Sequence, residues 1–382
     1  MKRVFIQSYC KYPRGGALAN YIENFAKAVS NAGYHVILVS DINPDYKDIK
    51  GAHFECYEMV YEIAPSACVD ERKEQREKGF AAERLDALKQ EKICDKDVVI
   101  VLGITNKYML EKLFEYRDQI GFKIMCAVFE MYELNDFDNV QDYEYVKFIK
   151  EEVYVRADAI LSISTWIDNF YEKRGVKTYR VPPLIDADES DVGIMMKDKY
   201  SFVIPTIKDS FAEVLMAFAG LTQTELQKVE VHICNSDRES ILKLLPIECW
   251  NSIERVTICH EWMSYEELVE LYKNMQFLIV ARKECQRTLA NFPSKVPECM
   301  NMGIVPIVSE VGDYTKYYLK DGENSIFIKS GEVSDIIAAL RKAIRLDEEG
   351  LRTYSENVKK FARDRFDFRI WKEQIREMIN GV

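Results

Sequence analysis

The first half of the chain alternates between short apolar runs and longer amphipathic segments. Apolar runs of strand length lie at residues 4–8, 35–40, 97–104, 123–130 and 158–164. An amphipathic segment closed by Gly33 joins the first two runs, which predicts a strand, a helix and a second, parallel strand. The charged stretch from Asp70 to Lys96 is typical of one or two solvated helices. We therefore expect an α/β domain here.

The alternation stops at Pro182-Pro183 and begins again near residue 200. Further apolar runs follow at residues 200–206, 229–235, 255–262, 277–282 and 304–309. Two doubly wound α/β domains in succession are the simplest architecture for this pattern. We assign the chain to a first domain at 1–185, a linker at 186–199, a second domain at 200–365 and a C-terminal amphipathic helix at 366–382.

Length and charge support this division and exclude some functions. At 382 residues the chain exceeds the roughly 250–300 residues at which a single core stops growing. The 63 acidic residues outnumber the 52 basic ones, and the net charge of −11 opposes a broad nucleic-acid interface. The N-terminal apolar stretch is too short for a signal peptide or a membrane span, so we expect a cytoplasmic protein.

The spacing of cysteine and histidine argues against disulfides and metal sites. The ten cysteines are scattered without a C-x-x-C pair, and several lie inside apolar runs, which favours reduced thiols. The four histidines show no metal-ligand spacing with one another or with the cysteines. His232 lies inside an apolar run and is interpreted as a packed core residue, whereas His260 ends such a run.

The most informative segment runs from Asn291 to Glu298, with the sequence NFPSKVPE. Ser294 is placed to cap a helix, and Pro297 then falls in the first turn, where its missing N–H costs little. A helix N-terminus with a hydroxyl and the Lys295 ammonium is suited to bind a diphosphate, and Glu298 could accept hydrogen bonds from a ribose diol. The same residues also fit an ordinary capped helix with a surface Lys and Glu, and the pattern leaves both interpretations open.

Several cations follow predicted strands of the second domain. Lys208 and Asp209 come after its first strand, and Arg282 and Arg287 come at and after the end of the run at 277–282. The carboxyl ends of parallel strands share one edge of the sheet, so these side chains could converge on one anion. A single loop Lys or Arg is usually solvated. The coincidence of several at one edge is what indicates an anion site.

Two further features lie at predicted strand ends. Gly15 and Gly16 follow the first strand and would let the backbone approach a ligand closely. Such a pair is more often only a turn, and the G-x-G-x-x-G motif of dinucleotide-binding proteins is absent. His260 falls on the same edge as the cations, where it either lines a nucleobase pocket or simply ends a strand.

Taken together, these residues resemble the retaining glycosyltransferases of family 4, which have the two-domain GT-B fold. The resemblance rests on an ordered set of segments: SISTWIDNFYEKRG before VPPLID, the Lys208-Asp209 pair, FPSKVPECMNMGIVPIVSEVGD and YYLKDGENSIFI. It runs through most of the chain and is strongest from Val181 onward. It implies an α/β fold of two Rossmann-like domains facing a cleft, with a last helix that crosses back to the first domain.

The resemblance also implies an activity. The second domain would bind a nucleotide-diphosphate sugar, and the first would present a glycan, lipid-linked or small-molecule acceptor. Lys208, Arg287 and Lys295 would neutralise the leaving diphosphate in the catalytic step, so that neither a metal nor a cofactor is needed. A lipid-linked acceptor would bring the protein to the inner face of the membrane.

The remaining residues of the predicted site would bind the donor. Ser294 would bond to the diphosphate, and Glu298 would hold the ribose. The Gly15-Gly16 loop would approach the diphosphate and the sugar. Arg282 and His260 complete the predicted donor site.

One position departs from the family pattern. Many members carry two Glu separated by seven residues, and Ala290 stands at the first of these positions. The group with FPSK before the second Glu often lacks the first, so we still expect activity. Ala290 and the acidic balance keep open the alternative of a non-catalytic transferase-like subunit that binds a glycan or a partner protein. A second alternative keeps the fold but changes the chemistry to epimerisation of a nucleotide-sugar, which usually needs carboxylates and His in the cleft, and this sequence offers few of them. No His occurs at 123–135, where relatives often have one.

Overall fold

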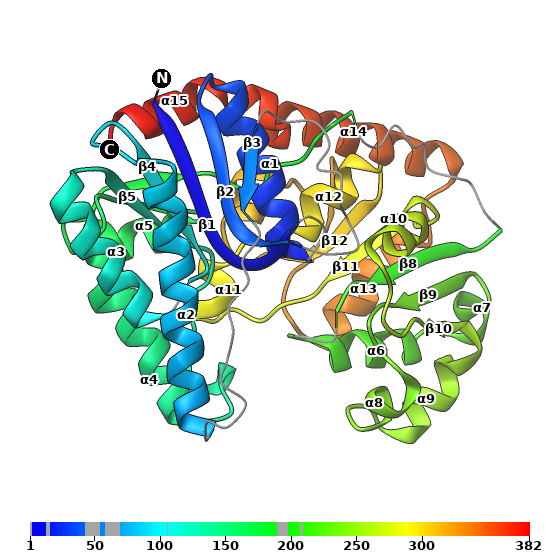
Figure 1. Ribbon diagram of the computed structural model, residues 1–382. Helices are drawn as coiled ribbons and strands as arrows, with labels where there is room; N and C mark the ends of the chain where they lie inside the picture. Colours follow the sequence, from blue (N-terminus) through cyan, green and yellow to red (C-terminus); the bar gives the residue numbers. More distant parts are fainter. Residues whose placement is uncertain are drawn as a thin grey trace. The chain divides into compact units, whose positions relative to one another are not determined.

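The computed structural model describes residues 2–12, 16–42, 54–57, 69–104, 106–188, 198–206 and 209–382. The chain divides into two compact units, of which unit 1 comprises Met1–Leu184 with Phe368–Val382 and unit 2 comprises Ile185–Asp367. Each unit is built on its own parallel sheet (Figure 1). None of the helices among the described residues is both long and apolar enough to span a membrane.

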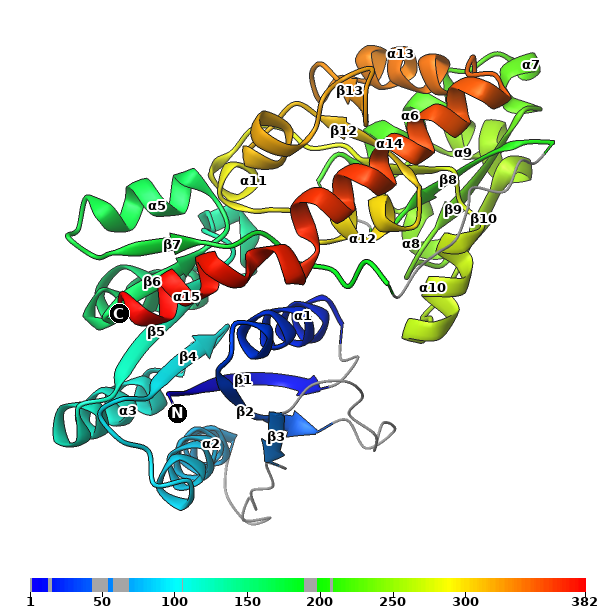
Figure 2. The same ribbon diagram turned by 90° about the horizontal axis from the view of Figure 1, so that it is seen from above.

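Within its described residues, unit 1 holds a seven-stranded parallel sheet in the order β3-β2-β1-β4-β5-β6-β7. The strands are β1 (Arg3–Tyr12), β2 (His35–Ile42), β3 (Phe54–Tyr57), β4 (Val98–Leu102), β5 (Lys123–Val128), β6 (Ala159–Ser162) and β7 (Thr178–Arg180). The helices are α1 (Ala17–Asn31), α2 (Val69–Gln90), α3 (Lys107–Ile120), α4 (Val140–Phe148), α5 (Thr165–Glu172) and α15 (Lys372–Asn380). Figure 2 shows α1 and α15 on one face of this sheet and α2 and α3 on the other.

Burial on both faces explains the sequence of the central strands in unit 1. All five residues of β4 are buried, and this strand is a continuous apolar run, as expected for a parallel sheet covered by helices on both sides. Helix α1 ends where Gly33 adopts a φ of 95°, a left-handed conformation that glycine reaches without strain. The chain can therefore turn directly into β2.

Unit 2 holds, within its described residues, a six-stranded parallel sheet in the order β10-β9-β8-β11-β12-β13. The strands are β8 (Tyr200–Ile204), β9 (Val229–Ile233), β10 (Thr257–Cys259), β11 (Phe277–Val280), β12 (Val305–Ser309) and β13 (Ile326–Ile328). The helices are α6 (Phe211–Ala219), α7 (Gln223–Leu226), α8 (Arg238–Leu242), α9 (Ile247–Ile253), α10 (Tyr265–Lys273), α11 (Gln286–Ala290), α12 (Lys295–Asn301), α13 (Val333–Ala343) and α14 (Glu348–Phe366).

The apolar core of unit 2 lies between one face of its sheet and helices α6, α9 and α13. Phe202 anchors it, because its ring stacks on Phe277 at 5.0 Å between centroids and meets Phe218 edge-on at 5.4 Å. Helices α12 and α14 pack against each other and against β12. Because side chains alternate along a strand, every second residue of each strand faces away from this core.

The C-terminal segment returns to unit 1, as the sequence predicts. Tyr34 donates from its hydroxyl to Asn380 Oδ1 at 2.9 Å, and Arg376 Nε donates to the Ala32 carbonyl at 2.9 Å. The single helix predicted at 366–382 is wrong in detail. Helix α14 ends at Phe366, a 3-10 turn covers Phe368–Trp371, and α15 follows.

Other predicted elements also need correction. The run at 255–262 gives only the three-residue strand β10. The charged stretch from Asp70 forms one helix, α2, which is not wholly solvated, because Arg84 is fully buried and donates from Nη2 to the Ser8 carbonyl at 2.7 Å. The short strands β3, β7 and β13 are absent from the sequence-based assignment, because three or four residues are too few to show a period.

A buried carboxylate ties the start of β1 to the start of β4. Asp97 is 1 % exposed and accepts hydrogen bonds from Arg3 Nη2 at 2.6 Å, from the Arg3 main-chain N–H at 3.1 Å and from the Cys94 N–H at 2.9 Å. Burial alone would raise the pKa of Asp97, but these hydrogen bonds outweigh it, and the pKa lies below its usual value.

We expect Asp97→Asn to lower the free energy of unfolding by about 1.5–3 kcal/mol, because hydrogen bonds to a charged group are lost. The stabilisation by a carboxylate with a lowered pKa is complete above the unfolded pKa of about 3.9 and is lost as the pH falls through the folded value. The difference between wild type and variant in urea unfolding should therefore shrink below about pH 4. The exposed Asp95, changed to Asn, is the matched control.

Candidate functional site

The loops at the carboxyl edge of the unit 2 sheet hold most of the predicted site. Asp209 follows β8 and has a φ of 55°, a left-handed conformation that Asp tolerates better than most residues. The next residue, Ser210, donates from its N–H to the Ala281 carbonyl at 3.4 Å, which ties this loop to the end of β11. Arg282 begins the loop after β11, so the two loops lie side by side.

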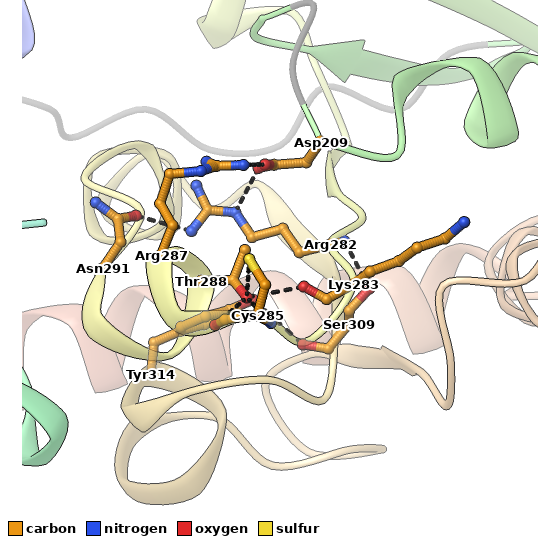
Figure 3. A network of polar contacts seen from close by, with 9 residues as sticks. All are labelled: Asp209, Arg282, Lys283, Cys285, Arg287, Thr288, Asn291, Ser309 and Tyr314. Atoms are coloured by element: carbon orange, nitrogen blue, oxygen red, sulfur yellow. Dashed lines mark hydrogen bonds and ion pairs between the residues drawn. The ribbon is translucent and has the colours of Figure 1, made fainter. Parts of the chain in front are cut away.

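Asp209 lies between two arginines (Figure 3). Its Oδ2 is 3.0 Å from Arg282 Nε, and its Oδ1 forms an ion pair with Arg287 Nη2. The Asp209 side chain is only 8 % exposed, and both guanidinium groups are largely buried beside it. One carboxylate therefore compensates two cations, and the cluster keeps a net charge of about +1 by simple counting of ionised groups.

Polar contacts beneath the arginines fix Arg282 in place. Its main-chain N–H donates to Ser309 Oγ at 2.8 Å, and its Nη1 donates to Asn291 Oδ1 at 2.8 Å. Tyr314 is fully buried and donates from its hydroxyl to the Ser309 carbonyl at 3.2 Å. Burial raises the pKa of Tyr314 to about 12 although Arg282 acts in the opposite direction, so this phenol stays neutral.

Lys295 and Glu298 form a second pair at the same edge. Lys295 Nζ donates to Glu298 Oε2 at 2.6 Å, and both side chains are partly exposed. Burial opposes the charge on Lys295, but Glu298 outweighs it and the pKa of the ammonium lies above its usual value. Burial also raises the pKa of the Cys234 thiol to about 12, and Lys295 opposes this shift, which places the ammonium near the loop after β9.

The predicted cap of this segment is wrong. Ser294 precedes α12, but it has helical φ and ψ of −59° and −26°, and its hydroxyl makes no capping hydrogen bond. Capping requires an extended backbone at this position, which a residue already inside a helical turn cannot supply. Helix α12 spans only Lys295–Asn301, with Pro297 in its first turn.

The other predicted residues are placed as follows. Gly16 directly precedes α1 in unit 1 with a φ of 106°, whereas Gly15 and Lys208 lie outside the described residues. His260 follows β10 and is hydrogen-bonded to His232. Ala290 ends α11 and is fully buried. The structure thus brings Arg282 and Arg287 together through Asp209, and it brings Lys295 and Glu298 together directly.

A cluster in unit 1 joins the aromatic-acidic segment at 129–145, which the sequence suggests either for an acceptor hydroxyl or as a solvated loop, to Lys150 and Tyr9, which the sequence analysis does not single out. Lys150 lies in a π-helical turn, Ile149–Val153, and is 8 % exposed. It donates to the Glu130 carbonyl just after β5, and its Nζ is 4.1 Å from the centroid of the Tyr132 ring. Tyr132 is hydrogen-bonded to Glu130. Burial is the main cause of the raised pKa of the half-exposed Tyr9, and the nearby Cys10 and Glu130 raise it further. No sequence period reveals a π turn, although such turns are frequent at functional sites.

Residues 188–361 match the family model described as Glycosyl transferases group 1. The matched segment covers most of unit 2. No curated protein matches the chain. Among solved structures, the sucrose-phosphate synthase from Thermosynechococcus elongatus is similar over 100 % of this chain and 98 % of its own, with a TM-score of 0.71 at 12 % identity.

Two other solved structures share the architecture. TarM covers 100 % of this chain and 99 % of its own with a TM-score of 0.74 at 10 % identity. Anabaena HepE in complex with UDP and glucose covers 100 % of both chains with a TM-score of 0.69 at 11 % identity. These likenesses confirm the predicted GT-B fold, and the match to the group 1 family model supports a glycosyltransferase.

The burial of the Lys150 amine leads to a testable prediction for how the free energy of unfolding depends on pH. Burial lowers the pKa of Lys150 to about 8, with the Glu130 carboxylate acting in the opposite direction. An unfolded Lys has a pKa of about 10.4, so between these values the unfolded state binds more protons and the stability of the folded state rises with pH. We expect the unfolding free energy of wild type, minus that of Lys150→Met, to rise by about 3 kcal/mol between about pH 8 and pH 10.4.

Urea unfolding at several pH values measures this difference, because the titration of other groups cancels between the two proteins. Lys147→Met, three residues earlier and partly exposed, is the control and should show a nearly constant difference. A difference that is flat with pH for Lys150→Met as well would show that Lys150 has an ordinary pKa.

Proposed function

We propose that this protein is a retaining glycosyltransferase of family 4, of the subgroup with FPSK before the second Glu. It transfers a sugar from a nucleotide-diphosphate sugar to a glycan, lipid-linked or small-molecule acceptor, in polysaccharide or glycoconjugate synthesis. The observation that carries the proposal is the set of compensated cations at the carboxyl edge of a group 1 domain, where doubly wound sheets bind ligands.

The arginine cluster is suited to a leaving diphosphate. Arg282 and Arg287 point at one carboxylate, and a phosphate group presents oxygen acceptors of the same kind. A diphosphate would take over the donors that Asp209 now occupies. Lys208, next in sequence to Asp209, would add a further positive charge. Stabilising the charge that develops on the leaving group is the largest contribution that such a site makes to catalysis.

Lys295 and Glu298 would separate when the donor binds. The ammonium would turn to the diphosphate, with the Ser294 hydroxyl as a further donor, and the carboxylate would accept hydrogen bonds from the ribose. Ligand-free pairing keeps both charges compensated, because an unpaired charge in a half-buried site is costly. A phosphate oxygen of the leaving group would take the acceptor's proton, so the reaction needs no metal or cofactor.

Unit 1 offers a place for the acceptor. Tyr9 is 54 % exposed and lies at the carboxyl edge of the unit 1 sheet, and Glu130 follows β5 at the same edge. An exposed aromatic ring beside a carboxylate is suited to a sugar, because the ring contacts the apolar face and the carboxylate accepts from hydroxyls. Tyr132 and Lys150 hold this segment in place. A lipid-linked acceptor would place this cytoplasmic protein at the membrane surface.

The proposal predicts that Lys295→Ala weakens nucleotide-diphosphate binding by about 1.5–3 kcal/mol, because a charge-assisted contact is lost. A thermal-shift screen against UDP, GDP, ADP, CMP and their sugar conjugates identifies the donor, since a ligand that prefers the folded state raises the melting temperature. Calorimetric titration of the best ligand then compares wild type with Lys295→Ala. Lys283→Ala is the control, because Lys283 is an exposed cation paired with Glu213.

Equal affinities of wild type and Lys295→Ala would remove Lys295 from the site. Binding of a glycan without binding of any nucleotide would favour the alternative of a non-catalytic subunit, for which Ala290 is the motivating residue. Turnover of the donor in the presence of acceptor extracts, with the anomeric configuration of the product read by NMR, tests transfer and retention directly.

A further inference from the structure

A chain of hydrogen bonds runs from Glu230 through His232 to His260 in unit 2. Glu230 and His232 are two residues apart on β9 and therefore share the sheet face that turns away from the apolar core. His232 Nε2 is 2.6 Å from Glu230 Oε1, and His232 Nδ1 is 2.9 Å from His260 Nε2. The two rings are within 11° of parallel, and His232 is only 7 % exposed.

The backbone holds His260 at the carboxyl edge of the sheet. His260 donates from its N–H to the Ile233 carbonyl at 2.8 Å and accepts from the Ser236 N–H at 2.9 Å. These bonds tie it to the loop that follows β9. Cys234 in the same loop has a thiol whose pKa responds to Lys295. His260 therefore lies at the same edge as the cations of the proposed donor site.

The chain of bonds dictates which nitrogen of His260 carries a hydrogen. An ionised Glu230 can only accept, so His232 Nε2 must be the protonated nitrogen. A neutral His232 then has a bare Nδ1, which accepts from His260 Nε2–H. His260 Nδ1 is left with a lone pair, and none of the residues that the structure describes donates to it. The edge thus presents a hydrogen-bond acceptor.

Protonation would reverse this arrangement. If His232 became an imidazolium, both of its nitrogens would donate, and His260 would carry its hydrogen on Nδ1 instead. Burial and the neighbouring His232 lower the pKa of His260, which favours its neutral form at neutral pH. Charged groups also lie around this pair: Asp237 and Arg238 shift the pKa of the adjacent Cys259 thiol in opposite directions, and Glu261 directly follows His260.

We infer that Glu230 and His232 hold His260 as the acceptor for a ring N–H of the donor's nucleobase, which selects uracil or guanine over cytosine or adenine. The inference rests on the proposed function. Uracil N3 and guanine N1 carry hydrogen, whereas cytosine N3 and adenine N1 are bare and would face the His260 lone pair. Such repulsion discriminates as strongly as a new attraction.

Strand order supports the placement of the base. The arginine cluster that would hold the diphosphate follows β8 and β11, which are the two middle strands of the sheet. β10 is the edge strand, two strands away from β8 and beyond β9. A nucleoside that extends from the diphosphate past Lys295 and the loop after β9 would bring its base to His260.

Calorimetric titration with UDP, GDP, CDP and ADP tests the inference on wild type, His260→Ala and Glu230→Gln. Wild type should bind UDP or GDP about tenfold more tightly than CDP and ADP, a difference of about 1.4 kcal/mol. His260→Ala should lose this preference. Glu230→Gln should weaken it by about threefold or more, because the amide can donate to His232 and allow the reversed tautomer. Glu261→Gln, an exposed neighbour, is the control.

Two further readouts separate this positioning from a merely structural effect. N3-methyl-UDP, or N1-methyl-GDP if guanine is preferred, lacks the ring N–H and should bind wild type and His260→Ala equally well. Because the pKa of His260 is lowered, the preference of wild type should persist at neutral pH and fall at acidic pH, where His260 becomes protonated, whereas His260→Ala should show no such change.

A wild-type preference for CDP or ADP would overturn the inference. Unchanged base preference in folded His260→Ala and Glu230→Gln, with melting temperatures near that of wild type, would do so as well. Those results would leave the proposed function intact. Failure of all four nucleotides to bind wild type would remove the proposed function together with the inference.

Discussion

The proposed anion site of unit 2 depends on the ion pairs that the Asp209 carboxylate makes with two arginines. Arg282 and Arg287 both contact it, and without a negative charge two guanidinium groups at this separation would repel each other. The left-handed backbone conformation at Asp209 and the hydrogen bond from the Ser210 N–H to the Ala281 carbonyl position the carboxylate beside the arginines. A site built in this way holds cations in a fixed arrangement before any ligand arrives.

The same logic extends to the rest of the edge. Lys295 is compensated by Glu298, and His260 is held by His232 and Glu230. A bound ligand would therefore replace the present partners of these side chains. The free energy of binding is then the difference between the ligand-bound contacts and the contacts within the protein that they replace. Such exchange limits affinity, but it avoids the cost of leaving unpaired charges in a half-buried site.

The sequence predicts the two α/β units and the edge at which the cations lie, because the periods of helix and strand and the geometry of parallel sheets are local or general rules. The sequence does not predict which side chains pair with one another at this edge. The sequence shows only that Asp209 follows Lys208. Its contacts with the two arginines depend on how the loops after β8 and β11 pack against each other. The sequence predicts His232 as a packed core residue. It is buried, but it lies on the sheet face turned away from the apolar core, and its partner His260 follows another strand whose register no local pattern reveals.

Ala290 is explained by packing around the arginines. It is fully buried at the end of α11, directly before Asn291, whose amide oxygen accepts from Arg282. Asp209 and Asn291 already engage the Arg282 guanidinium, so a further carboxylate is not needed to hold it. A Glu at 290 would also bring a charge into a space that excludes water, which costs several kcal/mol unless a cation pairs with it. The arginine arrangement of the proposed anion site can therefore persist without this Glu, because Asp209 supplies the negative charge.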